Sequence, residues 1–128
     1  MIAGIGTDIV SIVRIRHALL RHAGRFARKV LADAEWAVYT GLSDGAPYVA
    51  KRFAAKEAFF KALGEPSSAA NTWHQLTIGN EPSGRPCLQF GPELAALLQQ
   101  RGITRWHVSL SDEREYALAS IFLEREPP

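Results

Sequence analysis

The sequence is poor in cysteine and in long apolar runs. Cys87 is the one cysteine, so no disulfide can form within the chain, which fits a reducing compartment. No apolar run is long enough to span a membrane, and the N-terminus lacks the charged and then apolar segments of a signal peptide. We therefore expect a cytoplasmic protein without a membrane partner.

Excess charge of one sign is also scarce. The formal net charge is +2 over 128 residues, which is too small to predict a nucleic-acid partner. Zinc ligands are sparse too, because the four histidines are scattered and only one thiolate is available. With 47% hydrophobic residues, however, the chain can bury a core. Its length is that of one domain, residues 1–128.

One segment does concentrate charge. Residues 14–29 carry six basic side chains and no acid: Arg14, Arg16, Arg21, Arg25, Arg28 and Lys29. A basic surface of this kind can bind an acidic partner, a phosphate group or a membrane surface, and it can equally be the solvated face of a helix. The pattern alone leaves these interpretations open.

The N-terminal half is predicted to form one strand and then helices. The expected elements are a strand over residues 2–10 and helices over residues 12–22, 25–31, 34–40 and 44–63, with Gly24 as the break between the first two helices. Ser11 and Asp33 are typical N-caps of the helices that follow them. Pro47 suits the first turn of the longest helix, and Gly64 ends it.

The C-terminal half is predicted to be rich in hairpins. The expected elements are strands over residues 74–79, 86–90, 106–110 and 116–123, and a helix over residues 92–101. Residues 65–72 are polar and small, and they predict a loop. Because strands and helices do not alternate regularly, we expect an α+β fold with a mainly antiparallel sheet packed against the long helix.

Glu57 is an acid among apolar neighbours in the long helix. On a helical wheel, Phe53 and Phe60 lie within about 60° of it, so its side chain points into or along the edge of the apolar stripe. Lys61 follows one turn later, and an ordinary helical ion pair between the two would explain that spacing. A buried carboxylate needs a partner, however, and the phenylalanines favour a more specific role.

Asp8 follows two glycines on one face of the first strand. Gly4, Gly6 and Asp8 alternate on that face, and glycines beside an acid are expected to leave room for a bulky group near the carboxylate. Two acids with lysines nearby suggest a hard cation that holds phosphate oxygens. An aspartate that merely ends a strand is the simpler alternative.

Two further patterns bear on phosphate chemistry. Arg52 and Lys56 are like charges one helical turn apart, so a bound anion would stabilise both. In the strand near residues 106–111, His107 shares a polar face with Ser109 and Ser111, which suits a phosphate, a substrate hydroxyl or plain solvent. A hydrolase triad of Ser111, His107 and Asp112 is conceivable, but it lacks a nucleophile-elbow pattern.

Four short motifs together resemble the holo-acyl-carrier-protein synthases, the small type of 4′-phosphopantetheinyl transferase. The motifs are Gly4-Ile5-Gly6-Thr7-Asp8-Ile9-Val10, Arg52-Phe53-Ala54-Ala55-Lys56-Glu57-Ala58, Gly84-Arg85-Pro86 and His107-Val108-Ser109-Leu110-Ser111-Asp112-Glu113. The resemblance runs nearly end to end. It implies transfer of the phosphopantetheinyl arm of coenzyme A to a serine of apo acyl carrier protein, with release of 3′,5′-ADP.

The resemblance also implies roles for individual residues. Asp8 and Glu57 correspond to ligands of Mg²⁺, and Lys61 to a side chain that contacts the pyrophosphate or stabilises the leaving group; these three are the expected catalytic residues. Arg52, His107, Gly64 and Lys61 are expected to bind coenzyme A. Arg14, and by extension Arg21 and Arg25, are expected to bind the acidic helix of the carrier.

The resemblance implies a homotrimer whose active sites lie between neighbouring subunits. The chain departs from the family after Gly64, where a Thr-Gly-Ile type of loop is usual and residues 65–70 read Glu-Pro-Ser-Ser-Ala-Ala. The added acid and proline put the loop's contacts to coenzyme A in question. Two alternatives to the transferase are a protein that binds carrier or coenzyme A without turnover, and a basic nucleic-acid module.

Overall fold

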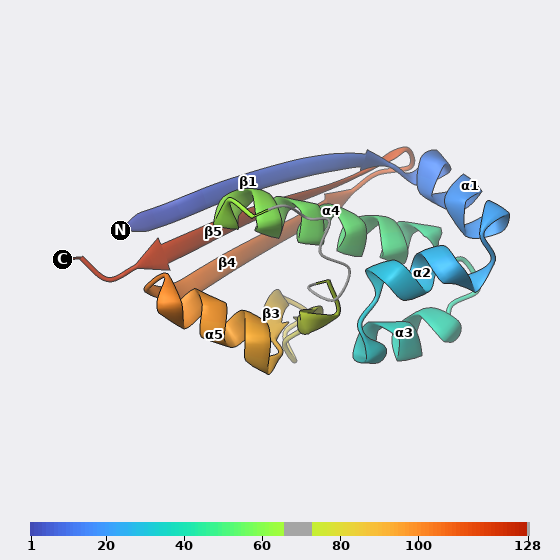
Figure 1. Cartoon of the computed structure of the whole chain (residues 1–128). Helices are drawn as coiled ribbons and strands as arrows, with labels where there is room; N and C mark the ends of the chain where they lie inside the picture. Colours follow the sequence, from blue (N-terminus) through green and yellow to red (C-terminus); the bar gives the residue numbers. More distant parts are fainter. Residues whose placement is uncertain (66–72, 128) are drawn as a thin grey trace.

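The computed structural model describes residues 1–65 and 73–127, and there a three-stranded sheet packs against one long helix (Figure 1). The elements in chain order are β1 (Ile2–Ser11), α1 (Ile12–Arg21), α2 (Gly24–Val30), α3 (Asp33–Thr40), α4 (Ala46–Leu63), η1 (Trp73–Gln75), β2 (Leu76–Asn80), β3 (Pro86–Phe90), α5 (Pro92–Gln100), β4 (Ile103–Asp112) and β5 (Tyr116–Arg125). This confirms the predicted α+β fold. Except for Glu65, the loop predicted over residues 65–72 lies outside the described residues.

The larger sheet has the order β1-β5-β4, and both pairings are antiparallel. The central strand β5 buries every second side chain against α4: Ala117, Ala119, Ile121 and Leu123. A separate antiparallel hairpin, β2–β3, pairs Ile78 with Leu88. The strands β4 and β5 extend beyond their predicted ranges because they pair with each other over nearly their whole length.

Gly4 and Gly6 allow α4 to lie directly on β1. A Cβ at Gly4 would collide with the carbonyl oxygen of Ala62, and one at Gly6 with that of Ala58. The expectation that these glycines leave room for a bulky group is therefore wrong, because the backbone of α4 fills the space. The consequence is that side chains on α4 come within reach of Asp8, the next residue on the same strand face.

The helix α4 is the centre of the core. Its aromatic pair Phe59 and Phe60 is fully buried and contacts edge to face, with ring centroids 5.2 Å apart. Pro47 occupies the first turn as predicted, although the helix begins at Ala46 rather than two residues earlier. Gly64 ends it in the left-handed conformation with φ of 76°, which glycine adopts without strain.

The predicted N-caps have different outcomes. The Ser11 hydroxyl accepts a hydrogen bond from the backbone N–H of Arg14, which confirms it as the cap of α1. The prediction for Asp33 is wrong, because this residue is already inside α3 and the cap position belongs to Ala32. Glu35, at the third helical position, instead accepts a hydrogen bond from the backbone N–H of Ala32, with 2.9 Å between that nitrogen and Oε1.

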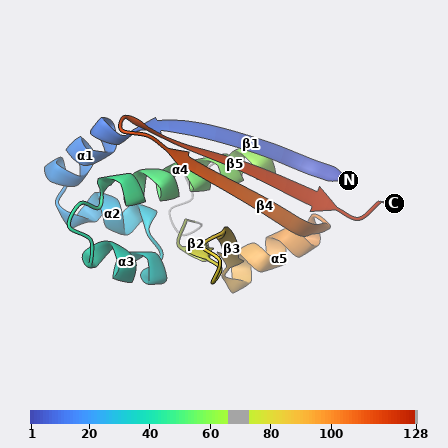
Figure 2. The same cartoon turned by 180° about the vertical axis from the view of Figure 1, so that it is seen from behind.

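None of the described elements covers the face of the larger sheet opposite α4, as the view from behind shows (Figure 2). It carries exposed apolar side chains from β1 and β5: Ile5, Ile9, Leu118 and Phe122. A contiguous apolar surface of this kind is typical of an interaction site.

Among the described residues, no helix combines the length and the apolarity needed to cross a membrane.

Candidate active site

Asp8 and Lys61 meet where β1 crosses α4. The Lys61 Nζ lies 2.9 Å from Asp8 Oδ1 and 3.1 Å from the carbonyl oxygen of Thr7. The side chain of Asp8 is 18% exposed and that of Lys61 is 53% exposed. A half-exposed ion pair contributes little stability, about 0–1 kcal/mol. Its significance is that it places an ammonium group and a carboxylate together at the surface.

Glu57 lies one turn before Lys61 on α4 and is half-buried. One turn earlier on α4, Phe53 packs against Phe26 and Trp73, with ring centroids 6.0 and 5.4 Å away. The half-buried state of Glu57 is that of a residue at the edge of this apolar stripe. The ammonium group of Lys61 points to Asp8 on the adjacent strand. Because Glu57 lies one helical turn before Lys61, it is on the same side of α4 as the lysine that contacts Asp8.

This acid pair suits a divalent ion that arrives with phosphate. Within residues 1–65 and 73–127, no group of three or more His, Cys, Asp or Glu side chains is arranged to hold a metal. Asp8 keeps Oδ2 outside its contact with Lys61, and Glu57 adds a second carboxylate. Mg²⁺ is commonly held by one or two carboxylates, with phosphate and water as its other ligands. The donor set therefore fits Mg²⁺ bound together with a phosphate ligand.

Arg52 lies on the other side of α4, about 140° around the helix from Glu57. Its side chain is buried, and its guanidinium carbon Cζ lies 4.0 Å from the centroid of the Tyr48 ring. Its Nη2 donates to the carbonyl oxygen of Ile78 at 3.2 Å. The structure therefore does not bring Arg52 together with Asp8 and Lys61 within one chain. Its Nε is buried without a hydrogen-bond partner among the described residues.

Lys56 is fully buried, and its partner is an acid of the protein itself. Its Nζ lies 2.6 Å from Glu35 Oε1, so the expectation that a bound anion balances Arg52 and Lys56 is wrong for Lys56. Burial lowers the pKa of the Lys56 ammonium, while the charge and hydrogen bond of Glu35 act in the opposite direction. Sequence reasoning missed Glu35, because an acid in the first turn of a helix is usually solvated.

His107 lies away from Asp8. It is on β4 at the opposite edge of the sheet, and it pairs with Phe122 on the uncovered face, whereas Asp8 pairs with the buried Ala119. Its Nε2 lies 2.6 Å from Glu124 Oε2, a hydrogen bond that lowers the pKa of Glu124. One chain therefore holds His107 and Asp8 apart.

The hydrolase alternative is wrong. His107 and Ser111 are four residues apart on one extended strand, which separates their backbones by about 13 Å. Asp112 instead forms an ion pair with Lys51 at 3.4 Å. The three side chains of the conceivable triad do not assemble.

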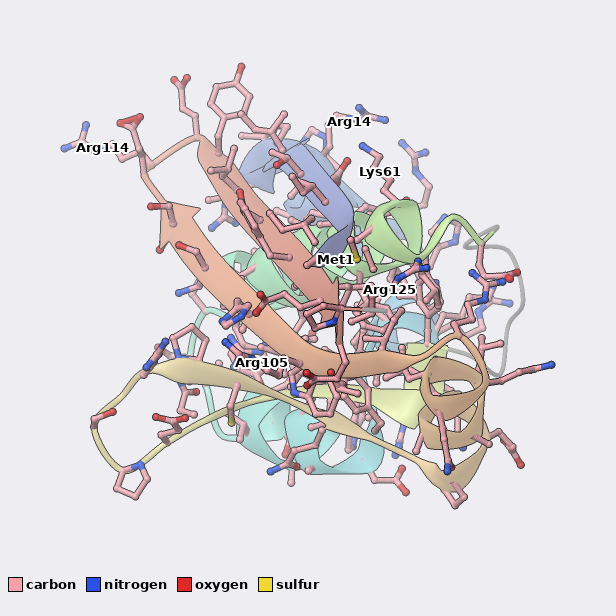
Figure 3. All side chains as sticks on the ribbon, turned by 90° about the vertical axis from the view of Figure 1, so that its left-hand side faces the viewer. Met1, Arg14, Lys61, Arg105, Arg114 and Arg125 are labelled. Carbon is pink, nitrogen blue, oxygen red and sulfur yellow. The ribbon has the colours of Figure 1, made fainter. Side chains whose placement is uncertain are left out.

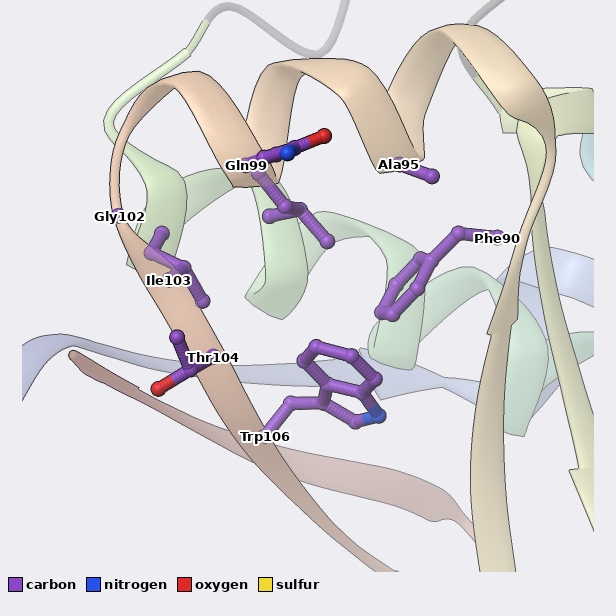
Figure 4. Close-up of a pocket in the computed structure, with 8 residues that line it drawn as sticks. Phe90, Ala95, Gln99, Gly102, Ile103, Thr104 and Trp106 are labelled. Atoms are coloured by element: carbon purple, nitrogen blue, oxygen red, sulfur yellow. The ribbon is translucent and has the colours of Figure 1, made fainter. Parts of the chain in front are cut away.

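Two hollows border β4. The first, of about 200 Å³, is mostly polar and lies between β3 and β4, where Arg85 and His107 line it together with Trp106. The second, of about 330 Å³, is apolar and lies between α5 and β4 (Figure 4). Trp106 borders both and meets Phe90 edge to face, with ring centroids 4.7 Å apart. Of these two hollows, the polar one has groups that can bind phosphate, Arg85 and His107.

The basic segment forms an exposed surface on α1 and α2. Arg14, Arg21 and Arg25 are all exposed, and Arg14 projects from the same side of the molecule as Lys61 (Figure 3). Two other basic residues are engaged within the fold: Arg16 pairs with Asp44 at 2.8 Å, and Arg28 lies over the ring of Trp36.

Apolar side chains lie among these arginines. Val13 and Leu20 on α1 are exposed, and Phe26 lines a hollow of about 440 Å³ with His22 and Lys29. Sequence reasoning singled out the charges and missed these apolar residues. Exposed leucine and valine at helical spacing within a basic run were the available signal.

Glu65 is neutralised within the fold. Its carboxylate forms an ion pair with Arg101, which also donates to the carbonyl oxygen of Leu63 at 2.5 Å. Arg101, which follows α5, thus links Glu65 to the C-terminal end of α4. Gly64 precedes Glu65 at the helix end, and residues 66–70 of the departing loop lie outside the described part of the chain.

Comparisons with known proteins place the chain in a family. Residues 4–121 match the family model of the 4′-phosphopantetheinyl transferase superfamily. The holo-acyl-carrier-protein synthase of Pectobacterium carotovorum is 44% identical over 123 residues, which is 96% of this chain and 98% of that protein.

Two crystal structures extend the likeness to the fold. The holo-acyl-carrier-protein synthase of Neisseria meningitidis is 39% identical, with a TM-score of 0.92 over 98% of this chain and 100% of that one. The enzyme of Bacillus anthracis in complex with CoA (3′,5′-ADP) is 32% identical, with a TM-score of 0.81 over 98% and 99%. The chain therefore belongs to the holo-acyl-carrier-protein synthases of the 4′-phosphopantetheinyl transferase superfamily.

Proposed function

We propose that the chain transfers the 4′-phosphopantetheinyl group of coenzyme A to a serine of an apo acyl carrier protein and releases 3′,5′-ADP. The observation that carries this proposal is the contact of Lys61 with Asp8, one helical turn from Glu57. The ammonium group of Lys61 can bind a pyrophosphate, and the carboxylates can bind the cation that accompanies it. The relatives named above carry the same activity in their names.

In the proposed reaction, the serine oxygen forms a bond to the phosphorus next to the pantetheine arm. The phosphoanhydride P–O bond breaks, and its electron pair leaves with the phosphate oxygen of 3′,5′-ADP. The serine proton passes to a water held by Glu57. Mg²⁺ bound by Asp8 and Glu57 would neutralise charge on the pyrophosphate oxygens.

Lys61 is proposed to stabilise the leaving phosphate. Its ammonium group is half-exposed on a flexible stem, so it can reach a ligand without breaking a core contact. Negative charge grows on the leaving oxygens during phosphoryl transfer, and a cation fixed beside them lowers the barrier. Asp8 holds that ammonium in place before the substrate arrives.

The proposed coenzyme A site needs a second copy of the chain. Arg85 and His107 line the polar hollow beside β4, while Asp8 lies at the other edge of the sheet and points to the other face. A neighbour that presents its own His107 to this Asp8 would complete the cleft. We propose a homotrimer joined through the uncovered sheet face, with Arg52 and Gly64 as further contacts to coenzyme A.

Sedimentation tests the assembly. The wild type is expected to sediment at three times the 14.1 kDa mass of the chain. Replacing Ile5 and Ile9 together with Asp puts charges on the apolar face, so this variant should dissociate and lose transfer activity. Val38→Asp on α3 is the matched control, because Val38 is comparably exposed but lies away from the sheet. A trimeric, active Ile5→Asp/Ile9→Asp variant would contradict the proposed interface.

The carrier is proposed to bind the exposed surface of α1 and α2. Arg14, Arg21 and Arg25 offer positive charge, and Val13 and Leu20 offer apolar contact between them. This combination suits an acidic amphipathic helix. Arg14 lies on the same side of the molecule as Lys61, so a carrier bound there would face the reacting groups.

Charge reversal tests the carrier surface. Arg14→Glu/Arg21→Glu is expected to raise KM for the carrier about 10-fold, because two exposed charge pairs become repulsive. KM for coenzyme A should stay near its wild-type value. Arg114→Glu, in the exposed β4–β5 turn, is the control. Equal effects on both substrates would argue against this surface.

Mass spectrometry tests the reaction itself. Purified protein with coenzyme A, Mg²⁺ and apo acyl carrier protein is expected to add one phosphopantetheinyl group to the carrier serine. No product with several carriers would refute the proposed function. Carrier binding by calorimetry without product would point instead to a protein that binds without turnover.

A further inference from the structure

The buried pair Glu35–Lys56 has no role in the proposed chemistry. Lys56 is 0% exposed and Glu35 is 1% exposed, and their charged atoms lie 2.6 Å apart. Removing two charges from water is costly, and apolar side chains of the same volume would often leave such a core equally stable or more stable. A pair retained at this cost calls for a role other than stability.

Lys56 ties α4 to two neighbouring segments. Its Nζ donates to the carbonyl oxygen of Val30 at 2.7 Å and to that of Trp73 at 3.0 Å, in addition to Glu35. The three hydrogens of the ammonium group are therefore all used. Through them, α4 is fixed to the end of α2 and to the start of η1.

Glu35 extends the connection to α3 and to the β2–β3 hairpin. Its Oε1 accepts from the N–H of Ala32 at 2.9 Å, and its Oε2 accepts from the N–H of Ile78 at 2.8 Å. Ile78 lies in the middle of β2. One carboxylate thus fixes the hairpin and the first turn of α3 against the same lysine.

The elements joined by this pair are those that carry the proposed sites. Helix α2 holds Arg25 of the carrier surface, and the β2–β3 hairpin leads to Arg85 of the polar hollow. Glu57, the proposed metal ligand, follows Lys56 directly in α4. A buried, fully bonded polar network allows only one arrangement of its elements, whereas an apolar contact tolerates small shifts.

We infer that Glu35 and Lys56 are positioning residues that set the carrier surface and the coenzyme A hairpin relative to Glu57. This inference rests on the proposed function. It requires no contact between the pair and either substrate. Displacements of about 1 Å can lower the rate of a transfer reaction about 10²-fold, so a small change in how these elements pack is sufficient.

The test removes both charges and keeps the volume. In Glu35→Gln/Lys56→Met, the amide oxygen of residue 35 can still accept from the N–H of Ile78, and no charge is left unpaired. In this variant the carbonyl oxygens of Val30 and Trp73 lose their donor and the N–H of Ala32 loses its acceptor, so we expect wild-type circular dichroism with a lower melting temperature. Its kcat should fall at least about 10-fold, and KM for the carrier should rise.

A control variant distinguishes a loss of kcat caused by misplaced elements from one caused by lower stability. Leu94→Val trims a buried side chain of α5, a helix to which the pair makes no hydrogen bond, so it should lower the melting temperature with little change in kcat. Wild-type kcat and KM in the folded double variant would overturn the inference. If the double variant does not fold, Glu35→Asp decides, because it keeps the charge and shortens the side chain by one methylene. Wild-type kinetics in folded Glu35→Asp would also overturn it.

The same experiment distinguishes failure of the inference from failure of the proposed function. If the wild type transfers no phosphopantetheinyl group, the proposed function fails. If the wild type transfers and the double variant matches it, only the positioning role fails.

Discussion

Glu57→Ala is expected to lower kcat for phosphopantetheinyl transfer by about 10²-fold or more, the scale of losing one preorganised electrostatic contact. Glu57 is half-buried one turn from the Lys61–Asp8 pair, so its removal takes one of two carboxylates from the proposed cation site. Asp8→Ala should have a similar effect, because Lys61 also loses its partner. Steady-state kinetics with saturating coenzyme A and carrier measure the change.

Metal removal gives an independent measurement of the same site. EDTA should abolish transfer by the wild type, and added Mg²⁺ should restore it. Glu93→Ala is the control for loss of an acid, because Glu93 is exposed in the first turn of α5. Near-normal turnover in Glu57→Ala, or transfer that survives EDTA, would defeat the assignment of Asp8 and Glu57 as metal ligands.

Gly6→Ala is expected to destabilise the fold by about 3 kcal/mol, at the upper end of overpacking costs. The added methyl would collide with the carbonyl oxygen of Ala58, and a backbone atom of a packed helix cannot move aside as a side-chain end can. For a chain of this size, the melting temperature should fall by roughly 10 °C. Differential scanning calorimetry of the variant and the wild type measures both quantities.

Gly79→Ala is the matched control. Gly79 is also a strand glycine, but a Cβ there would lie 3.7 Å from the Cys87 sulfur, an ordinary contact. Its melting temperature should stay within a few degrees of the wild type. If Gly6→Ala melts like Gly79→Ala, then β1 and α4 are less tightly apposed than the structure indicates. Gly6→Ala should also lower kcat, since it moves β1, which carries Asp8, away from Glu57.

For the glycines of β1, the predicted strand pattern was correct, but the predicted purpose of the glycines was wrong. The alternation of Gly4, Gly6 and Asp8 on one face was predictable, because side chains alternate along any strand. What occupies the space beside a glycine depends on the element that packs there. The sequence suggested a ligand, and the fold places the carbonyl groups of α4 in that space.

The long helix shows the same limit. Its proline in the first turn, its end at Gly64 and the place of Glu57 one turn after Phe53 followed from spacing and local conformation. The helical wheel gives directions only around the helix's own axis. It therefore could not show that Lys56 meets Glu35, which lies 21 residues earlier in the chain.

The sequence by itself determined the local features. These are the α+β class, the acid after the glycines of β1, the spacing of one helical turn between Glu57 and Lys61, and the basic run of α1 and α2. These depend on the periods of helices and strands and on motifs of a few residues. Only the tertiary structure decided which distant groups meet. Lys61 reaches Asp8 across 53 residues, and His107 faces away from both. The physical reason is that such contacts depend on how whole elements pack, and packing is set by the shape of the complete core rather than by any one segment.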